Sequence, residues 1–213
     1  MGVRQIRWWI GFAGGLLLTG SGAAATEARP PGDRATRILS ALVIAYPDLL
    51  AGHDGKSVIW RDGTRMTFDD GVRGKRFDDL LNRPDLEDQF YAPYPRGRRG
   101  LRPGVNIDPG RVRFEPFFKK MYGDCKRGKL GGRLVDVVWL PKHWGKRVKV
   151  TSVNGVAKRL QAVSNELDAL PGKFLKYLKP SAGTYNCRTI AGTKRLSVHA
   201  FGAAIDINVK YAD

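Results

Sequence analysis

Cysteine and long apolar runs are scarce in this sequence of 213 residues. Two cysteines are too few for a disulfide-dense miniprotein. No run of about 18 or more uncharged apolar residues follows residue 25, which excludes a multi-spanning membrane protein. A G-x-S-x-G motif is also absent, so we do not expect a serine hydrolase of the nucleophile-elbow type. Hydrophobic residues still make up 42% of the chain, enough to build the core of one domain.

The N-terminus has the layout of a secretory signal peptide. Arg4 and Arg7 precede the apolar stretch Trp8–Leu18, and a run of small residues ends at Ala25. This order predicts a signal peptide over residues 1–25, with an uncleaved anchor as the alternative. We therefore expect a secreted or periplasmic protein.

Acidic residues are outnumbered: 20 Asp and Glu stand against 37 Lys and Arg, a formal net charge of +17. Cleavage of residues 1–25 removes two arginines and leaves +15. Such a surplus on an exported protein predicts peripheral contact with an anionic cell envelope. We expect no nucleic-acid partner, because export and the lack of zinc-finger, helix-turn-helix or RNA-binding signatures argue against one. We expect a monomer.

The remaining chain divides into a Pro-rich flexible leader at residues 26–34 and a single domain at 35–213. Helical and strand-like patterns alternate without a βαβ rhythm, which predicts an α+β domain with an antiparallel sheet and packed helices. The helix with the clearest periodicity is predicted over residues 154–170, with Asn154 as N-cap, and its apolar stripe is expected to face the core. Helices are predicted from residue 38 to an end between 47 and 52, over 77–90 with a break at Pro84, and over 114–122 and 154–170. Strands are predicted over 57–60, 65–68, 133–140, 147–152 and 203–209, and a surface loop over 91–108.

Cys125 and Cys187 are an even number of cysteines in what we expect to be an oxidising compartment. This favours one disulfide, and two unpaired buried thiols are the alternative. The bond would close a loop of about sixty residues and contribute roughly 4 kcal/mol in the chain-entropy treatment. A cysteine-ligated zinc site is not expected, because neither cysteine has a second one nearby.

The segment with the clearest chemistry is residues 183–208, GTYNCRTIAGTKRLSVHAFGAAIDIN. His199 precedes a bend at Gly202, and Asp206 follows in an apolar run that predicts a strand. An imidazole nitrogen and a carboxylate oxygen placed in this way can face one point, and zinc accepts both as ligands. A carboxylate buried in an apolar run would also need a cation to neutralise it. A hydrogen-bonded His–Asp pair is the alternative.

Residues 197–206, SVHAFGAAID, resemble the S-x-H-x-x-G-x-A-x-D pattern of the M15 zinc peptidases, a family of D-Ala-D-Ala carboxypeptidases, dipeptidases and L,D-endopeptidases. Residues 185–188, YNCR, and the pair Gly192-Thr193 resemble the lead-in of that family. The resemblance implies a peptidase-like core at about residues 130–213 with a hedgehog/DD-peptidase-like fold. It also implies a secreted zinc carboxypeptidase or endopeptidase that acts on peptidoglycan stem peptides.

The resemblance also implies roles for individual residues, with Zn2+ as the cofactor. His199 and Asp206 are two zinc ligands. Arg188 is a catalytic residue that holds the substrate carbonyl or carboxylate, and a surface salt bridge is its alternative role. Ser197 hydrogen-bonds the substrate or the neighbouring backbone. Zinc then lowers the pKa of its bound water and polarises the scissile carbonyl.

The family takes its third zinc ligand, a histidine, and its general base from a later segment, and this sequence ends seven residues after Asp206. The remaining histidines lie outside any matching context: we expect His53 at the end of a helix and His143 in a loop between two strands. We expect a truncated version of a longer enzyme. The alternatives are completion of the site by another residue, and a non-catalytic module that binds zinc or the cell wall.

Overall fold

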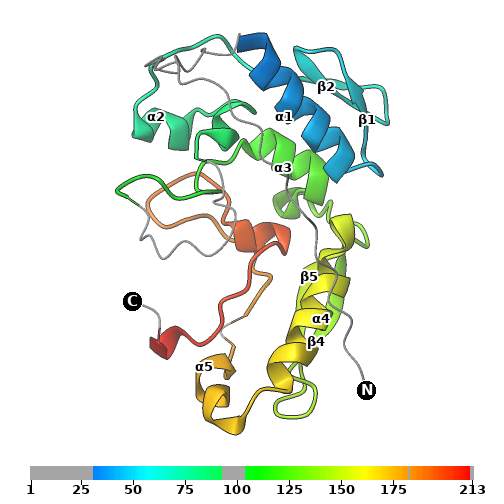
Figure 1. Cartoon of the computed structure of the whole chain (residues 1–213), viewed down its shortest axis with the longest axis vertical. Coiled ribbons are helices and arrows are strands. Elements are labelled where there is room, and N and C mark those ends of the chain that lie inside the picture. Colours follow the sequence, from blue (N-terminus) through cyan, green and yellow to red (C-terminus); the bar gives the residue numbers. More distant parts are fainter. Residues whose placement is uncertain (1–30, 93–103, 182, 212–213) are drawn as a thin grey trace, which may run out of the picture.

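The computed structural model describes residues 31–92, 104–181 and 183–211. These residues form a mixed α+β structure with two separate small antiparallel sheets (Figure 1). The predicted signal peptide, residues 26–30 of the leader and residues 93–103 of the predicted loop lie outside the described residues. No helix in the described ranges is long and apolar enough to cross a membrane.

Helix α1 (Pro31–Ala45) and a three-stranded sheet form the N-terminal layer (Figure 1). Residues 31–34, assigned to the leader on sequence, are helical. The helix ends at Ala45, before the predicted end between residues 47 and 52, because Leu50–His53 pairs as strand β1 with β2 (Ser57–Trp60).

The predicted hairpin between the second and third strands is confirmed. β2 pairs in antiparallel fashion with β3 (Arg65–Thr67). Asp62 accepts hydrogen bonds from the backbone nitrogen of Thr64 at 3.0 Å and from its hydroxyl at 2.6 Å. Gly63 takes the left-handed conformation that the turn requires, with φ of +81°. Local turn chemistry therefore determines this connection.

The break predicted at Pro84 is confirmed, since α2 (Phe77–Asn82) is followed by a separate turn, η1 (Asp88–Phe90). Helix α3 (Glu115–Tyr122) also forms as predicted. It buries Phe117, Met121 and Tyr122 in the core under α1 and the three-stranded sheet. This core is the larger of the two in the described residues.

The second sheet is the hairpin β4 (Leu134–Trp139) and β5 (Lys146–Thr151), close to the predicted bounds. Helix α4 (Val156–Asp168) packs on it around a core that contains Val137, Trp139 and Val150 (Figure 1). The adjoining chain forms the short helices η3 (Val153–Gly155), η4 (Gly172–Phe174) and α5 (Leu175–Leu178).

Two details of α4 differ from the sequence prediction. Asn154 is not the N-cap: it adopts a left-handed conformation with φ of +54°, and Gly155 takes the cap position. The predicted stripe is also only partly buried, because Val163 is 47% exposed. Ser164 is fully buried instead, and its hydroxyl hydrogen-bonds the backbone of β4 at Val138. A polar side chain of α4 therefore satisfies the hydrogen-bonding capacity of a backbone carbonyl in β4.

The predicted disulfide is confirmed, because Cys125 and Cys187 are joined in the structure. Cys125 lies in the short helix η2 (Cys125–Arg127) that follows α3. The bond ties the C-terminal segment to the end of α3.

The predicted strand over residues 203–209 does not form. Asp206 makes one isolated bridge to Gly183, and the chain then turns into η6 (Val209–Tyr211). The side chain of Asn208 donates to the carbonyls of Lys176 and Lys179, at 2.8 Å each, and so ties this segment to α5. Figure 1 shows the C-terminal segment running from beneath α3 towards α5.

Candidate metal site at His199 and Asp206

His199 lies in η5 (Val198–Phe201), a single turn whose position is set by its apolar neighbours. Ala200 and Phe201 are buried in the larger core. The Phe201 ring lies 5.4 Å from the Phe118 ring of α3. Gly202 ends the turn in a left-handed conformation, and its carbonyl accepts a hydrogen bond from Thr151 of β5 at 2.9 Å. The turn that carries His199 is therefore held between α3 and β5.

The structure brings His199 and Asp206 together. Nε2 of His199 lies 3.3 Å from Oδ2 of Asp206. Two zinc ligands at about 2.1 Å in tetrahedral geometry would lie about 3.4 Å apart, so this separation fits a shared ion.

The second nitrogen of the His199 ring is already engaged. Nδ1 lies 2.5 Å from the carbonyl oxygen of Thr184. A carbonyl only accepts hydrogen bonds, so Nδ1 carries a proton. In the neutral ring Nε2 is then an acceptor that faces a carboxylate, and two acceptors attract only when a proton or a cation lies between them. In metal-binding histidines, the ring nitrogen that does not bind the metal typically donates a hydrogen bond of this kind.

Asp206 is more exposed than the sequence predicted. Its side chain is 51% exposed, so the argument that a buried carboxylate needs neutralising is wrong for this residue. A backbone hydrogen bond of 2.9 Å from Asp206 to the Gly183 carbonyl fixes its place instead. Asp206 lines an open cleft of about 490 Å³ whose walls include Tyr177, Leu178 and Ile205.

Ser197 caps the turn that carries His199. Its hydroxyl accepts from the backbone nitrogen of His199 at 3.4 Å, and the residue is only 5% exposed. Of the two partners expected for Ser197, the neighbouring backbone is the one observed.

Arg188 is exposed, and its backbone carbonyl accepts from the Ser197 nitrogen at 3.0 Å. Its guanidinium reaches only the Thr189 carbonyl, at 3.5 Å. It has no carboxylate partner among the described residues, so the alternative of a structural salt bridge finds no support there. The structure thus brings the backbone of Arg188 next to the motif and leaves its charged end available.

No third ligand joins His199 and Asp206 within the described ranges. His53 lies in β1, where its Nε2 is 2.9 Å from the Ser40 hydroxyl, so the expected position at a helix end is wrong. His143 lies in the loop between β4 and β5 as predicted, and its ring bonds Asp168.

The acidic groups that could hold an ion in the described residues lie elsewhere, around Asp85. The ammonium of Lys75 already occupies that cluster, at 2.8 Å from Asp70 and 2.7 Å from Asp88. Burial opposes the charge of Lys75, but its hydrogen bonds to these carboxylates raise its pKa above the ordinary value. The cluster is an ion-pair network in which Lys75, Asp85 and Asp88 are largely buried and Asp70 is exposed.

Sequence reasoning missed the backbone partners of the site. The carbonyl of Thr184 and the bridge at Gly183 orient His199 and Asp206, but backbone groups carry no residue-specific signal. Both residues lie within residues 183–208, directly before the YNCR stretch that resembles the peptidase lead-in.

No protein-family model matches this chain, and searches of curated proteins and of solved structures also found no match.

Proposed function

We propose that this protein is a secreted zinc-dependent peptidase of the D-Ala-D-Ala carboxypeptidase or L,D-endopeptidase type, with a hedgehog/DD-peptidase-like core. The observation that carries the proposal is the 3.3 Å separation of His199 Nε2 and Asp206 Oδ2, combined with the engagement of Nδ1 by Thr184. The imidazole nitrogen and the carboxylate oxygen face one another across the bend at Gly202, and a divalent cation can bind between two such acceptors.

His199 and Asp206 would hold the zinc ion, which supplies an activated water and polarises the scissile carbonyl. Each residue has a defined task. Thr184 keeps the proton of His199 on Nδ1 and so leaves Nε2 free to coordinate. Arg188 would bind a substrate carboxylate or carbonyl through its planar donors, which are unpaired by acids in the described part of the chain.

The cleft beside Asp206 supports binding of an extended peptide. Its walls combine the apolar side chains of Ile205, Ile207 and Val209 with the rings of Tyr177 and Tyr211, which lie 4.8 Å apart. The formal charge of +15 that remains after removal of residues 1–25 supports accumulation on an anionic polymer such as the cell wall. We therefore propose peptidoglycan stem peptides as the substrate class.

The metal part of the proposal is tested by binding alone. The full chain, stripped with chelator, is titrated with Co2+ and its visible absorption is recorded, and zinc is then used as competitor. We expect one equivalent of metal to bind, and His199→Ala and Asp206→Asn each to weaken binding more than tenfold. His143→Gln is the matched control, since it removes a histidine whose side chain is 40% exposed and lies outside the site.

The hydrolytic part is tested with purified sacculi. Zinc-loaded protein should release peptide fragments or D-alanine, and His199→Ala should not. Arg188→Gln should lower kcat/KM while leaving cobalt binding unchanged, because it acts on substrate rather than on metal. Metal binding without any release of product would overturn the peptidase assignment.

A second candidate function is a non-catalytic zinc- or wall-binding module. The observation that favours it is that only two metal ligands converge among the described residues. In this case sacculus pull-down survives His199→Ala and weakens steeply with salt.

A further inference from the structure

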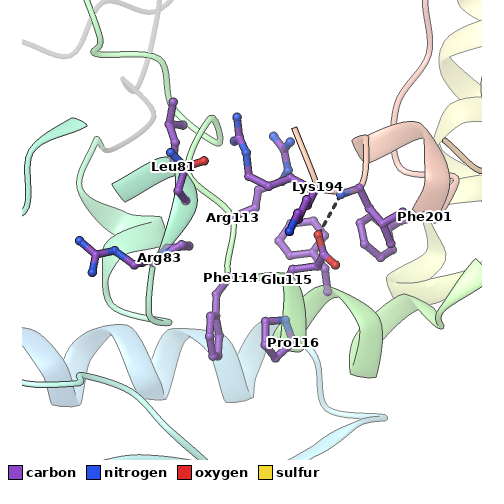
Figure 2. Close-up of a pocket in the computed structure, with 13 residues that line it drawn as sticks. Leu81, Arg83, Arg113, Phe114, Glu115, Pro116, Lys194 and Phe201 are labelled. Carbon is purple, nitrogen blue, oxygen red and sulfur yellow. Dashed lines mark hydrogen bonds between the residues drawn. The ribbon is translucent and has the colours of Figure 1, made fainter. Parts of the chain in front are cut away.

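A second pocket lies away from the candidate metal site, at the junction of α2, α3 and the C-terminal segment. It has a volume of about 260 Å³, and neither His199 nor Asp206 lines it. Figure 2 shows Arg83 at the end of α2 with its guanidinium directed outward, Arg113 on the chain that leads into α3, and Lys194 on the C-terminal segment. Three segments that are far apart in the sequence thus line one pocket.

The pocket is strongly cationic. Arg83, Arg113, Lys194 and Arg195 line it, and Glu115 is the single acidic side chain among the described residues of its lining. Glu115 is already engaged: it accepts from the backbone nitrogen of Leu196 at 2.8 Å, the bond drawn in Figure 2, and pairs with Lys119 at 2.7 Å. Arg83 is likewise paired, with Asp79 at 2.7 Å.

Arg113 and Arg195 have no such partner. Neither guanidinium meets a carboxylate in the part of the chain that the structure describes. Arg113 reaches only the backbone carbonyls of Gly110 and Arg111, at 3.2 and 3.4 Å. Nε of Arg195 is buried with no hydrogen-bond acceptor. Such a buried charged donor is costly unless another group satisfies it.

The electrostatics of Arg113 agree with this geometry. Burial, followed by the nearby charge of Arg195, lowers the pKa of Arg113 from its ordinary value. The two guanidinium groups therefore repel one another inside the pocket, and a bound anion would relieve both the burial and the repulsion.

The rest of the wall is apolar. Leu196 and Phe201 are 4% and 2% exposed, and Phe118 and Leu81 add to the same surface. Figure 2 shows the ring of Phe201 at the pocket, opposite the end of α2. A ligand must therefore combine an apolar body with one anionic end.

We propose that this pocket binds a small organic carboxylate whose anionic end lies between Arg113 and Arg195 and whose hydrocarbon body packs against Phe118 and Phe201. The two guanidinium forks present donors in the geometry that a carboxylate accepts. The site is independent of the metal site and requires no zinc.

The test uses phenylacetate as the probe, titrated into the full chain and followed by ligand-observed NMR. Phenylacetate should bind at least tenfold more tightly than phenylacetamide, which has the same body without the charge. Arg113→Gln and Arg195→Gln should each weaken binding about tenfold. Arg76→Gln is the matched control, since it removes the same charge from a side chain that is 82% exposed and outside the pocket.

Several outcomes would overturn the proposal: equal binding of phenylacetate and phenylacetamide, unchanged binding in both pocket variants, or tight binding of phenyl phosphate with none of phenylacetate. The comparison of the two probes on the unaltered protein needs no variant, so it holds even if a substitution impairs folding. Binding should also survive His199→Ala. Its loss in that variant would place the carboxylate at the metal site instead.

Discussion

Nδ1 of His143 lies 2.8 Å from Oδ1 of Asp168 and so joins the loop of the β4–β5 hairpin to the end of α4. The same carboxylate accepts from the backbone nitrogens of Lys142 and His143, at 2.6 and 3.3 Å. Asp168 is 3% exposed. One acid therefore holds the turn of the hairpin against the helix that covers it.

Asp168→Asn should lower the melting temperature, most strongly near neutral pH. Burial raises the pKa of Asp168, but hydrogen bonds from Lys142 and His143 outweigh it and hold the pKa below the usual 3.8. A depressed folded-state pKa gives stability that is present above the unfolded value and lost as pH falls through the folded value. Thermal melts of both proteins from pH 7 to pH 2 should therefore converge at the acid end.

The matched control for that series is Asp136→Asn, which alters an exposed pair with Lys149 at 3.1 Å on the same hairpin. It should change the melting temperature little. Equal losses in the two variants would show that Asp168 has no special part in the hairpin.

Gly202→Ala should destabilise the protein by about 3 kcal/mol. The glycine has φ of +64°, and a Cβ there would lie 2.5 Å from Leu134 Cδ2 and 3.0 Å from the backbone nitrogen of Thr151. Gly192→Ala separates the two causes, because Gly192 has φ of +71° with open space around it. It should cost only about 1 kcal/mol, from backbone strain alone. Urea unfolding measures both free energies, and equal values would exclude the steric contribution at Gly202.

Lys75→Met should cost about 3 kcal/mol of unfolding free energy, because it leaves the largely buried carboxylates of Asp85 and Asp88 without their cation. Lys149→Met breaks the exposed pair with Asp136 and should cost less than about 1 kcal/mol. Urea unfolding compares the two. A Lys75 variant as stable as the Lys149 variant would mean that the Lys75 cluster is solvated in the folded protein.

Local chemistry explains what the sequence could predict. The turn at Asp62-Gly63 depends on neighbours within two residues, and the break at Pro84 follows from the missing amide of proline. His199 and Asp206 were predicted to converge because they are seven positions apart across a glycine bend, and they do.

Long-range contacts determine the features of the site and of the second pocket that the sequence could not predict. The exposure of Asp206 depends on α5 and on the bridge to Gly183, neither of which leaves a periodic pattern. The pocket of Arg113 and Arg195 lies where two distant segments meet, and a hydrogen bond from the Leu196 amide to the Glu115 carboxylate joins positions 81 residues apart there. A sequence with 37 basic residues gives no way to select these two.

Removal of the Cys125–Cys187 disulfide should lower the unfolding free energy by about 4 kcal/mol, since it frees a loop with a sequence separation of 62. Cys187 lies in the segment that also supplies Thr184 and Arg188, so its release should loosen the hydrogen bond that orients His199. The double variant Cys125→Ser/Cys187→Ser is compared with the oxidised protein by urea unfolding and by the cobalt titration. We expect lower stability together with weaker cobalt binding. The cobalt titration is run far below the melting temperatures, where both proteins are folded. Unchanged cobalt affinity there would show that α3 and η5 position the imidazole without help from the disulfide.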